Sequence, residues 1–375
     1  MNILVIGWYG TETLGDRAIL DGIIRVFDEI EVCEYILGSL YPFFSERTLH
    51  EENQFVLNSE NSHKIRIFDL KEKKDVDDAI HEADIVVIGG GPLMNLPELS
   101  IIKYCFKKAK EKGKKTVIFG CGVGPISSKD NVTFLESIVN DSNLVILRDA
   151  RSWNRLKQLG IVHDRIKVLG DPAVISVEEY KKKQEDVRSD DAYLAVNFRN
   201  IENMEYGESK RFGLEKCRNL LEKASRYFKT IKLVPMHTFF IGGDDREFLY
   251  KIIDGCDFLK EAEIETPKNL DELYTVFYYA AGCIGMRYHS VVMQTILNGN
   301  NYIVDYNRKA GQKTIGFLEE YNLVEQYSGR IWDINDELDC HLIDFSGGKK
   351  TWKYSLIKEE YIKEIQALIK EGENK

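Results

Sequence analysis

Short apolar runs alternate with longer amphipathic segments through the first half of the chain. The runs are typical of buried strands, and the segments between them carry apolar residues at helical spacing. The predicted strands are NILVIG, DIVVIGGG, KKTVIFGCG, NLVILRD and RIKVLGDP, and the predicted helices are GDRAILDGIIRVFDEI, SIIKYCFKKAKEKG, NVTFLESIVNDS and ARSWNRLKQLG. Continuous apolar strands separated by helices indicate a parallel sheet covered on both faces, so we predict a Rossmann-like domain over residues 1–180.

The same alternation returns in the second half. The predicted strands there are AYLAVNFR, TIKLVPMH, GCIGMR and NYIVDY, and the predicted helices are LEKCRNLLEKASRYF, DREFLYKII, NLDELYTVFYYA and HSVVMQTILNGN. Between the halves, EEYKKKQEDVRSDD (178–191) is highly charged and almost without apolar residues, which is typical of a linker. We therefore place the domain boundary there and predict a second Rossmann-like domain, with its own parallel sheet, over residues 190–345.

The last segment, YSLIKEEYIKEIQALIKEGENK, has an amphipathic pattern with Leu356, Tyr361, Ile365 and Ile369 near one face of a helix. Within residues 350–375 we therefore predict a helix that packs on a domain already formed, and a return to the first domain is one way to do so. Two facing Rossmann-like domains with a cleft between them make a GT-B-like α/β architecture.

The charge and the cysteine content exclude some classes of partner and site. The formal net charge is −10, from 51 Lys and Arg against 61 Asp and Glu, and no long block of one sign occurs, so nucleic acid is not an expected partner. Seven cysteines are scattered without CxxC spacing, which excludes common zinc and redox patterns and indicates reduced thiols in the cytoplasm. We expect most of them to be small core residues, and we expect no metal site.

Neither a signal peptide nor a membrane span is predicted. MNILVIGWYG has no basic residues before its apolar run, so it is typical of a first strand. No apolar run approaches the roughly 18 residues that a spanning helix needs. We expect a cytoplasmic protein, and contact with the inner membrane face stays open. Homo-oligomerisation also stays open, since apolar stretches such as YPFF (41–44) fit either a subunit contact or a loop that folds beneath.

Ligands of open α/β sheets bind beyond the carboxyl ends of the strands, so the loops after the strands hold the candidate residues. The first loop, GWYGTETLGD, offers Gly10 for close backbone approach and Asp16 as a ligand contact or a helix cap. Its spacing differs from GxGxxG, so a nicotinamide dinucleotide is weakly supported. In GGGPLM and GCGVGP, Gly90, Gly91 and Gly122 suit contact with a ligand or an opposing loop, and plain turn geometry is an equal alternative.

Charged residues follow later strands. Arg148, in LRDARS, is a candidate binding residue, although a structural salt bridge with Asp149 or a helix cap is favoured. In the second half, Arg199 ends one predicted strand, His237 ends the next, and Arg287 and His289 follow GCIGM.

If the second half is built as predicted, these last residues share one edge of a sheet. Cationic groups that converge there suit a small, multiply charged anion. His289 at a helix start feels a dipole that disfavours its charged form, which keeps it able to exchange a proton near neutral pH. Tyr288 and Lys309 are further candidate contacts.

Taken in order, these motifs resemble the polysaccharide pyruvyl transferase family. The matching stretches are GWYGTETLGDRAIL, GGGPLM, GCGVGP, LRDARSWNRLKQLG, LGDPA, VPMH, GMRYHSVVMQTILNG and DYNRKAGQ, from about residue 3 to residue 325. Single motifs are modest in specificity, whereas their order and spacing together are strong.

The resemblance implies a GT-B-like enzyme that moves the enolpyruvyl unit of phosphoenolpyruvate onto a sugar, usually as a ketal that bridges two hydroxyls. The R-x-H motif of the family falls on Arg287 and His289, and its strand-end arginine matches Arg199. In family terms the arginines hold the carboxylate and phosphate of the donor, and the histidine is the acid or base. Such chemistry needs a proton shuttle and cationic clamps, with no nucleotide cofactor and no obligatory metal.

The resemblance leaves the acceptor open. The family usually has an asparagine before the Gly-Asp pair of the first loop and an acidic residue after it, whereas this chain has Thr13 and Arg17. The sugar, its hydroxyl pair, the stereochemistry of the ketal and a nucleotide or lipid-diphosphate carrier are not defined by the sequence.

Two other interpretations compete with pyruvyl transfer. One is a GT-B glycosyltransferase with a nucleotide-sugar donor, for which a carboxylate within Leu318–Glu320 would bind the ribose. The other is a non-catalytic sugar- or nucleotide-binding relative, which the presence of both Arg287 and His289 disfavours.

Overall fold

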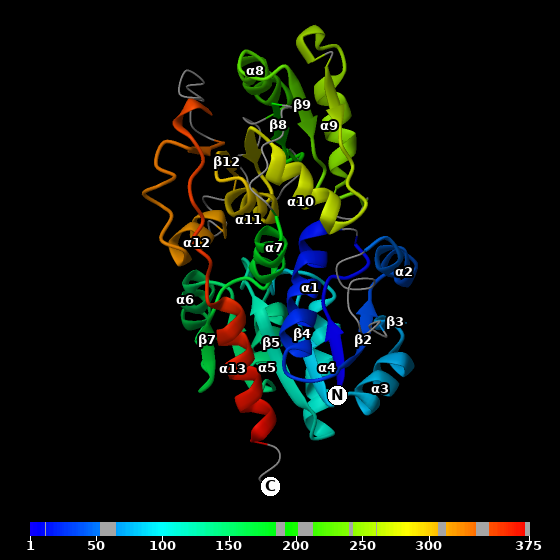
Figure 1. The fold of residues 1–375 in the computed structure, drawn as a ribbon. Helices are drawn as coiled ribbons and strands as arrows, with labels where there is room; N and C mark the ends of the chain where they lie inside the picture. Colours follow the sequence, from blue (N-terminus) through cyan, green and yellow to red (C-terminus); the bar gives the residue numbers. More distant parts are fainter. Residues whose placement is uncertain are drawn as a thin grey trace. The chain divides into compact units, whose positions relative to one another are not determined.

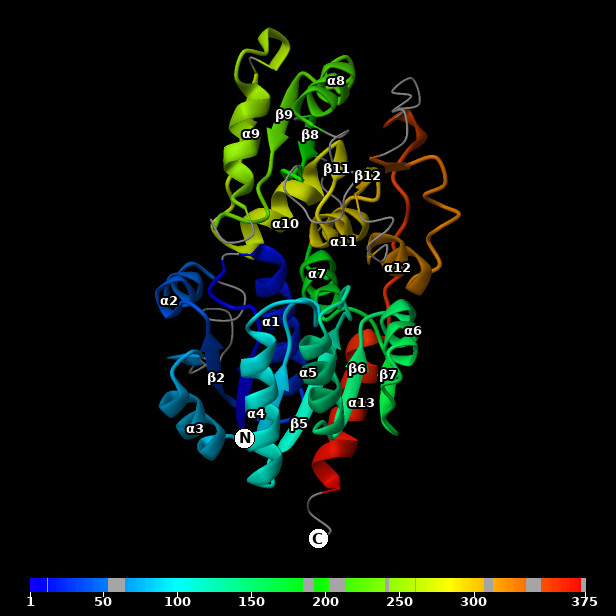
Figure 2. The same ribbon diagram turned by 180° about the vertical axis from the view of Figure 1, so that it is seen from behind.

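The computed structural model describes residues 1–11, 13–52, 65–184, 192–201, 213–239, 243–259, 261–306, 313–334 and 345–371. Its contacts divide the chain into two compact units (Figure 1 and Figure 2). The first unit comprises Met1–Ser176 and Ser355–Lys375, and the second comprises Val177–Tyr354. The C-terminal segment therefore belongs to the first unit.

A parallel sheet forms the centre of the first unit, with strand order β3-β2-β1-β4-β5-β6-β7 among the described residues. Its strands are β1 (Asn2–Ile6), β2 (Glu34–Ser39), β3 (Ile65–Asp69), β4 (Ile85–Ile88), β5 (Lys115–Cys121), β6 (Leu144–Leu147) and β7 (Ile166–Val168). The helices are α1 (Leu14–Asp28), α2 (Pro42–Glu51), α3 (Lys73–Glu82), α4 (Leu99–Glu111), α5 (Lys129–Asn140), α6 (Ala150–Gln158), α7 (Ala173–Lys182) and α13 (Ile357–Lys370). The order of the strands reverses beside β1, between β2 and β4.

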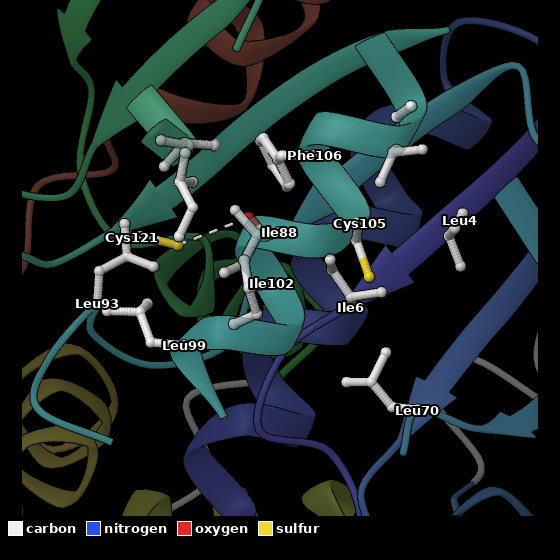
Figure 3. Packing of buried hydrophobic residues seen from close by; sticks show 14 of the residues in the cluster. Leu4, Ile6, Leu70, Ile88, Leu93, Leu99, Ile102, Cys105, Phe106 and Cys121 are labelled. Atoms are coloured by element: carbon white, nitrogen blue, oxygen red, sulfur yellow. Dashed lines mark hydrogen bonds between the residues drawn. The ribbon is translucent and has the colours of Figure 1, made fainter. Parts of the chain in front are cut away.

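Helices cover both faces of this sheet, which explains why its central strands are continuously apolar. Helices α1 and α13 lie over one face (Figure 1), and α4 and α5 lie over the other (Figure 2). Leu4 and Ile6 of β1 belong to the same apolar cluster as Ile102 and Phe106 of α4 (Figure 3). On the opposite face, the ring of Phe119 lies 5.9 Å from that of Phe27 and 4.5 Å from that of Tyr361.

Most cysteines of the described part are small, buried core residues, and Cys256 is partly exposed. Cys105 and Cys121 lie among aliphatic side chains (Figure 3), and both are fully buried. Burial raises the pKa of each thiol to about 12, so both stay protonated and unreactive at neutral pH. Cys340 lies outside the described residues.

The C-terminal helix packs back onto the first unit, as the sequence predicts. Tyr361 donates a hydrogen bond of 2.8 Å to the Gly170 carbonyl, and the carbonyl of Ile369 accepts one of 2.6 Å from Lys115. One detail of the prediction is wrong, because Leu356 is 69% exposed. The helix begins one residue later, at Ile357, which brings Ile357, Tyr361, Ile365 and Leu368 into the interior.

The predicted linker 178–191 begins inside a helix, because α7 continues to Lys182. The segment has more interior contacts than its charge suggests. Trp352 donates a hydrogen bond of 2.7 Å to the buried Glu178 carboxylate, and the ring of Tyr180 lies 5.2 Å from that of Tyr274. The division into units falls within α7, between Ser176 and Val177.

The second unit holds a parallel sheet with strand order β10-β9-β8-β11-β12-β13. Its strands are β8 (Tyr193–Val196), β9 (Thr230–Leu233), β10 (Ala262–Ile264), β11 (Gly282–Gly285), β12 (Asn301–Asp305) and β13 (Ile331–Asp333). The helices are α8 (Leu214–Ala224), α9 (Asp245–Ile253), η2 (Asp257–Leu259), α10 (Leu270–Tyr279), α11 (Tyr288–Leu297), α12 (Lys313–Glu320) and η4 (Phe345–Gly347). No helix of the described residues is long and apolar enough to cross a bilayer.

Candidate functional site

Three predicted site residues lie together at the carboxyl edge of the second sheet. Arg199 follows β8, His237 follows β9 and Arg287 follows β11, and these three parallel strands are adjacent. The structure therefore places them beyond neighbouring strand ends, as their positions in the sequence predict.

A buried carboxylate holds Arg287. Asp245, the first residue of α9, is 1% exposed, and both of its oxygens accept hydrogen bonds from the guanidinium. The Arg287 Nε lies 2.7 Å from Oδ2, and Nη2 lies 2.6 Å from Oδ1. Burial opposes the charge of Arg287, but the Asp245 carboxylate outweighs this effect and raises the pKa of the guanidinium above its ordinary value.

Asn197 ties the same strand ends together through the main chain. Its Oδ1 accepts a hydrogen bond of 3.0 Å from the Arg287 amide, and its Nδ2 donates one of 2.9 Å to the Val234 carbonyl. Because Asn197 follows β8, its side chain links that strand to its two neighbours, β11 and β9. The buried Asn197 amide thus both accepts and donates a hydrogen bond, and these two bonds fix the main chain beneath the candidate site.

His237 presents a neutral imidazole to this edge. Its side chain is 7% exposed, and Nε2 has no hydrogen-bond partner within the described ranges. The pKa of His237 falls from its ordinary 6.5 to about 4, first because of burial and then because of the positive charge of Arg287, against an opposing effect of Asp245. A buried polar atom without a partner marks a place where a ligand group can supply the missing hydrogen bond.

Arg199 is the second arginine at the carboxyl edge of this sheet. Its amide donates to the Met286 sulfur at 3.5 Å, and its guanidinium carbon lies 5.5 Å from the centre of the Tyr306 ring. Nη1 also lies 3.4 Å from the Tyr306 hydroxyl. The contact with Tyr306 orients a guanidinium that also lowers the pKa of His237.

His289 is the second residue of α11 and is half-buried. Its ring lies 4.9 Å from the ring of Tyr288 at an angle of 77°, and Tyr288 is itself buried. The Ser290 hydroxyl donates to the Arg287 carbonyl at 2.7 Å and fixes the first turn of the helix. His289 thus lies at a helix N-terminus, which confirms its predicted position.

In the first unit, the glycine-rich loops pack on each other. A β-carbon on Gly7 would lie 2.0 Å from the Gly89 carbonyl oxygen, and one on Gly91, where φ is +72°, would lie 2.5 Å from the Trp8 ring. Gly10 has a φ of +85° and lies against Ser39 and Tyr41. Contact with an opposing loop, one of the alternatives predicted for Gly91, is therefore present at that position. Gly90 belongs to the same loop and also has a positive φ, of +102°.

Asp16 borders a small pocket of about 20 Å³ that Trp8, Tyr9, Thr11 and Thr13 also line, and this volume suits about one water molecule. Tyr9 is 5% exposed, and its hydroxyl has no hydrogen-bond partner in the described part of the chain. Burial, and then the Asp16 carboxylate, raise the pKa of Tyr9 well above its ordinary value.

Arg17, one of the departures from the family pattern, is held in the interior. Its Nη1 lies 3.2 Å from the carboxylate of Glu52, which is fully buried, and 3.8 Å from that of Glu51. The substitution at this position therefore forms an ion pair with the end of α2. Thr13 is the N-cap residue of α1, without a hydrogen bond from its side chain to the helix.

Arg148 lies in the interior, at 4% exposure. Its Nε donates to Asp149 at 3.1 Å, and Nη1 lies 3.7 Å from the Asp171 carboxylate. A β-carbon on Gly122 would lie 2.3 Å from Nη2, so this glycine makes room for the guanidinium. The structural alternative predicted for Arg148 agrees with this geometry better than ligand binding does.

Two further predictions concern residues outside this edge. Lys309 lies outside the described residues. In α12, Leu318 is fully buried and Glu319 is exposed. Within the described ranges, no group of three or more His, Cys, Asp and Glu side chains could hold a metal ion.

Asp245 and Asn197 belong to the site but were not among the predicted residues. Asp245 belongs to GGDDREF at the start of a predicted helix, where an acidic residue reads as a cap. Asn197 is a polar residue inside an otherwise apolar stretch, YLAVNF, and this interruption was the available signal.

Among the solved structures that resemble this chain are several UDP-N-acetylglucosamine 2-epimerases. UDP-GlcNAc 2-epimerase from Methanocaldococcus jannaschii is 14% identical, with a TM-score of 0.64 over 98% of this chain and 100% of that one. UDP-N-acetylglucosamine 2-epimerase from Rickettsia bellii is 11% identical, with a TM-score of 0.60 over 98% and 96%. The enzyme from Neisseria meningitidis is 8% identical, with a TM-score of 0.58 over 98% and 100%. At such identities the likeness shows the fold alone, which is GT-B-like.

No curated protein matches the chain. A sequence profile of the family "Polysaccharide pyruvyl transferase" matches residues 14–308, which is most of the chain. This match spans both units and includes Arg199, His237, Arg287 and His289. The chain therefore belongs to the polysaccharide pyruvyl transferase family.

Proposed function

We propose that this protein transfers the enolpyruvyl group of phosphoenolpyruvate to a sugar of a glycan, or of its nucleotide- or lipid-linked precursor, and forms a pyruvate ketal. Family membership supports transfer of this kind. The observation that carries the proposal is the convergence of Arg199, His237 and Arg287 beyond three adjacent strands. Phosphoenolpyruvate carries a carboxylate and a phosphate, and two guanidinium groups match these charges.

Each residue has a distinct role in the proposal. Arg287 and Arg199 bind the anionic groups of the donor through charge-assisted hydrogen bonds. His237 offers Nε2 to a ligand oxygen without adding charge, because its low pKa keeps the ring neutral. His289, at the start of α11, moves the proton, and the buried Tyr288 holds its ring.

The reaction balances with these groups alone. His289 donates a proton to the methylene carbon of the donor, which becomes a methyl group, and C2 becomes electrophilic. A sugar hydroxyl adds to C2 and gives its proton back to His289, and the C2–O bond to phosphate breaks. A second hydroxyl then adds to C2 and closes the ketal, and its proton leaves with the phosphate, so hydrogen phosphate is the other product. Neither a redox cofactor nor a metal takes part in the proposed steps.

The acceptor belongs, in this proposal, to the first unit, where the β1–α1 and β4–α4 loops meet at the reversal of strand order. Asp16 and the loop glycines are the candidate contacts. UDP-linked sugars are the first acceptors to test, since a structure with this fold was solved bound to UDP-GlcNAc. Cytoplasmic location, contact with the inner membrane face, homo-oligomerisation and a role for Lys309 stay predictions.

Calorimetric titration with phosphoenolpyruvate, beside UDP-sugars, tests the donor. We expect saturable binding of phosphoenolpyruvate that weakens by a factor on the order of 100 in Arg287→Ala, since a charge-assisted pair is lost. Arg226→Ala is the matched control, because it removes an exposed guanidinium of the same unit. Binding of a UDP-sugar without any binding of phosphoenolpyruvate would instead favour a glycosyltransferase.

Turnover then tests the proton shuttle. In His289→Ala we expect donor affinity close to wild type and turnover lower by a factor on the order of 100 or more. Unchanged turnover in a folded His289→Ala protein would remove this residue from the mechanism. Donor binding without turnover on any sugar acceptor would favour the non-catalytic relative.

A further inference from the structure

Asp245 makes more contacts than a helix cap requires. Both oxygens of its carboxylate bind the Nε side of Arg287, at 2.7 and 2.6 Å. Oδ2 also accepts hydrogen bonds from the amides of Met236 and His237, at 3.0 and 3.1 Å. The amide of Asp245 in turn donates to the His237 carbonyl at 2.9 Å. One buried side chain therefore fixes the loop after β9 and the arginine after β11 to each other.

These contacts leave one part of Arg287 for a ligand. A guanidinium has two edges that can bind an oxyanion, one with Nε and one with both terminal nitrogens. Asp245 occupies the Nε edge, and Nη2 has a further weak contact of 3.4 Å with the Gly243 carbonyl. Nη1 makes no hydrogen bond to any described residue, and the side chain is 13% exposed.

Stability alone is a poor explanation for such a pair. Taking two charges out of water is unfavourable, and a buried ion pair is often no more stabilising than apolar residues of the same volume. Its geometry, by contrast, is specific, because a bidentate contact fixes the plane of the guanidinium as well as its position. Asn197 fixes the main chain of Arg287 at the same time.

We propose that Asp245 is a positioning residue, which turns the terminal nitrogens of Arg287 toward the anionic donor by occupying its Nε edge. The inference rests on the proposed function for the identity of the anion, a carboxylate or phosphate of phosphoenolpyruvate. Arg287 then binds this anion end-on through its Nη1 side, and Asp245 itself touches no substrate.

The neighbouring residue provides a matched control. Asp244 is the N-cap of α9, and it accepts hydrogen bonds from the Arg246 amide at 2.9 Å and from the Arg246 guanidinium at 2.6 Å. Its side chain is more exposed, at 24% against 1% for Asp245. The two acids thus hold two different arginines from consecutive positions at the start of α9.

The test compares Asp245→Asn with Asp244→Asn by two measurements. Phenylglyoxal modification, followed by peptide mass spectrometry, reports how accessible each arginine is without any ligand. In Asp245→Asn we expect Arg287 to react at least about fivefold faster, and in Asp244→Asn we expect only Arg246 to accelerate, since each arginine loses a charged partner. Thermal unfolding checks that both variants fold, and Asp245→Glu, which keeps the charge but moves it, replaces Asp245→Asn if that variant does not fold.

Phosphoenolpyruvate kinetics then separate positioning from general damage. We expect Asp245→Asn to raise the KM for phosphoenolpyruvate by a factor on the order of 10, with a smaller change in kcat, and Asp244→Asn to leave both within about twofold. Equal Arg287 reactivity in wild type and the folded Asp245 variant would overturn the inference, whatever the substrate. If the wild-type protein neither binds nor turns over phosphoenolpyruvate, the proposed donor is refuted. The modification experiment would still decide whether Asp245 orients Arg287.

Discussion

Neutral His237 makes the stability of the second unit depend on pH. Its side chain is 7% exposed, and burial together with the charges of Arg287 and Arg199 lowers its pKa from 6.5 to about 4. In the unfolded chain the ring takes up a proton below about pH 6.5, whereas in the folded protein it does not until about pH 4. Within this window the unfolded state binds more protons, so the free energy of unfolding falls as the pH falls.

The magnitude follows from the two pKa values. A difference between 6.5 and about 4 corresponds to at most about 3 kcal/mol, lost progressively between these two pH values. Above pH 6.5 the effect is absent, since both states are neutral. Replacement by Asn, which does not titrate, should remove this part of the pH dependence.

The assay is urea unfolding of wild type and His237→Asn at about pH 7.5 and about pH 4.5. We expect wild type to lose about 2 kcal/mol more than the variant on acidification, which is most of the linkage effect. His81→Asn removes an exposed histidine of the other unit and controls for histidine number. Equal acid sensitivity of wild type and His237→Asn, or an NMR titration of the His237 ring with a midpoint near 6.5, would refute the reasoning.

Two predictions concern the packing of the first unit. Gly122→Ala places a β-carbon 2.3 Å from the buried Arg148 guanidinium. We therefore expect the free energy of unfolding, measured in urea, to fall by about 2 kcal/mol. A change under about 0.5 kcal/mol would contradict the close contact. Tyr361→Phe removes the hydrogen bond to the Gly170 carbonyl and should lower stability by about 1 kcal/mol, whereas Tyr361→Ala also removes the contact with Phe119 and should cost about 4 kcal/mol. Equal losses in the two Tyr361 variants would show that the ring contributes nothing to docking of α13.

The sequence predicts the central strands better than the edge strands. β1, β4 and β5 are buried on both faces, so their continuous apolar runs stand out. The segment that contains β2, α2, β3 and α3 gave no prediction. β3 is an edge strand in which exposed Arg66 alternates with apolar residues, and β10 and β13, at the edges of the other sheet, are three residues each. Edge strands are short and half-solvated, so their pattern is weak.

Candidate site residues could be predicted only where the backbone alone brings them together. Arg199, His237 and Arg287 end parallel strands, and such ends share one edge of a sheet. Asp245 lies 42 positions before Arg287 in the sequence, and its pairing depends on the path of the loop after β9. Arg148 shows the converse, because a strand-end arginine can also turn inward when a glycine, here Gly122, leaves it room.

The two units differ in how their strand-end loops are built, and this difference supports the proposal that the donor binds the second unit. In the first unit, Gly7 and Gly91 are in contact with the opposing loop, and the pocket beside Tyr9 has room for about one water molecule. In the second unit, Asp245 accepts hydrogen bonds from the Nε edge of Arg287, and Asn197 accepts one from its main-chain amide. Within the described residues, Nη1 of Arg287 and Nε2 of His237 have no hydrogen-bond partner. Groups that are held rigidly and yet lack a hydrogen bond are suited to bind an anion without reorganisation. The donor anion is therefore expected at the second unit, where the charged groups are already oriented for it.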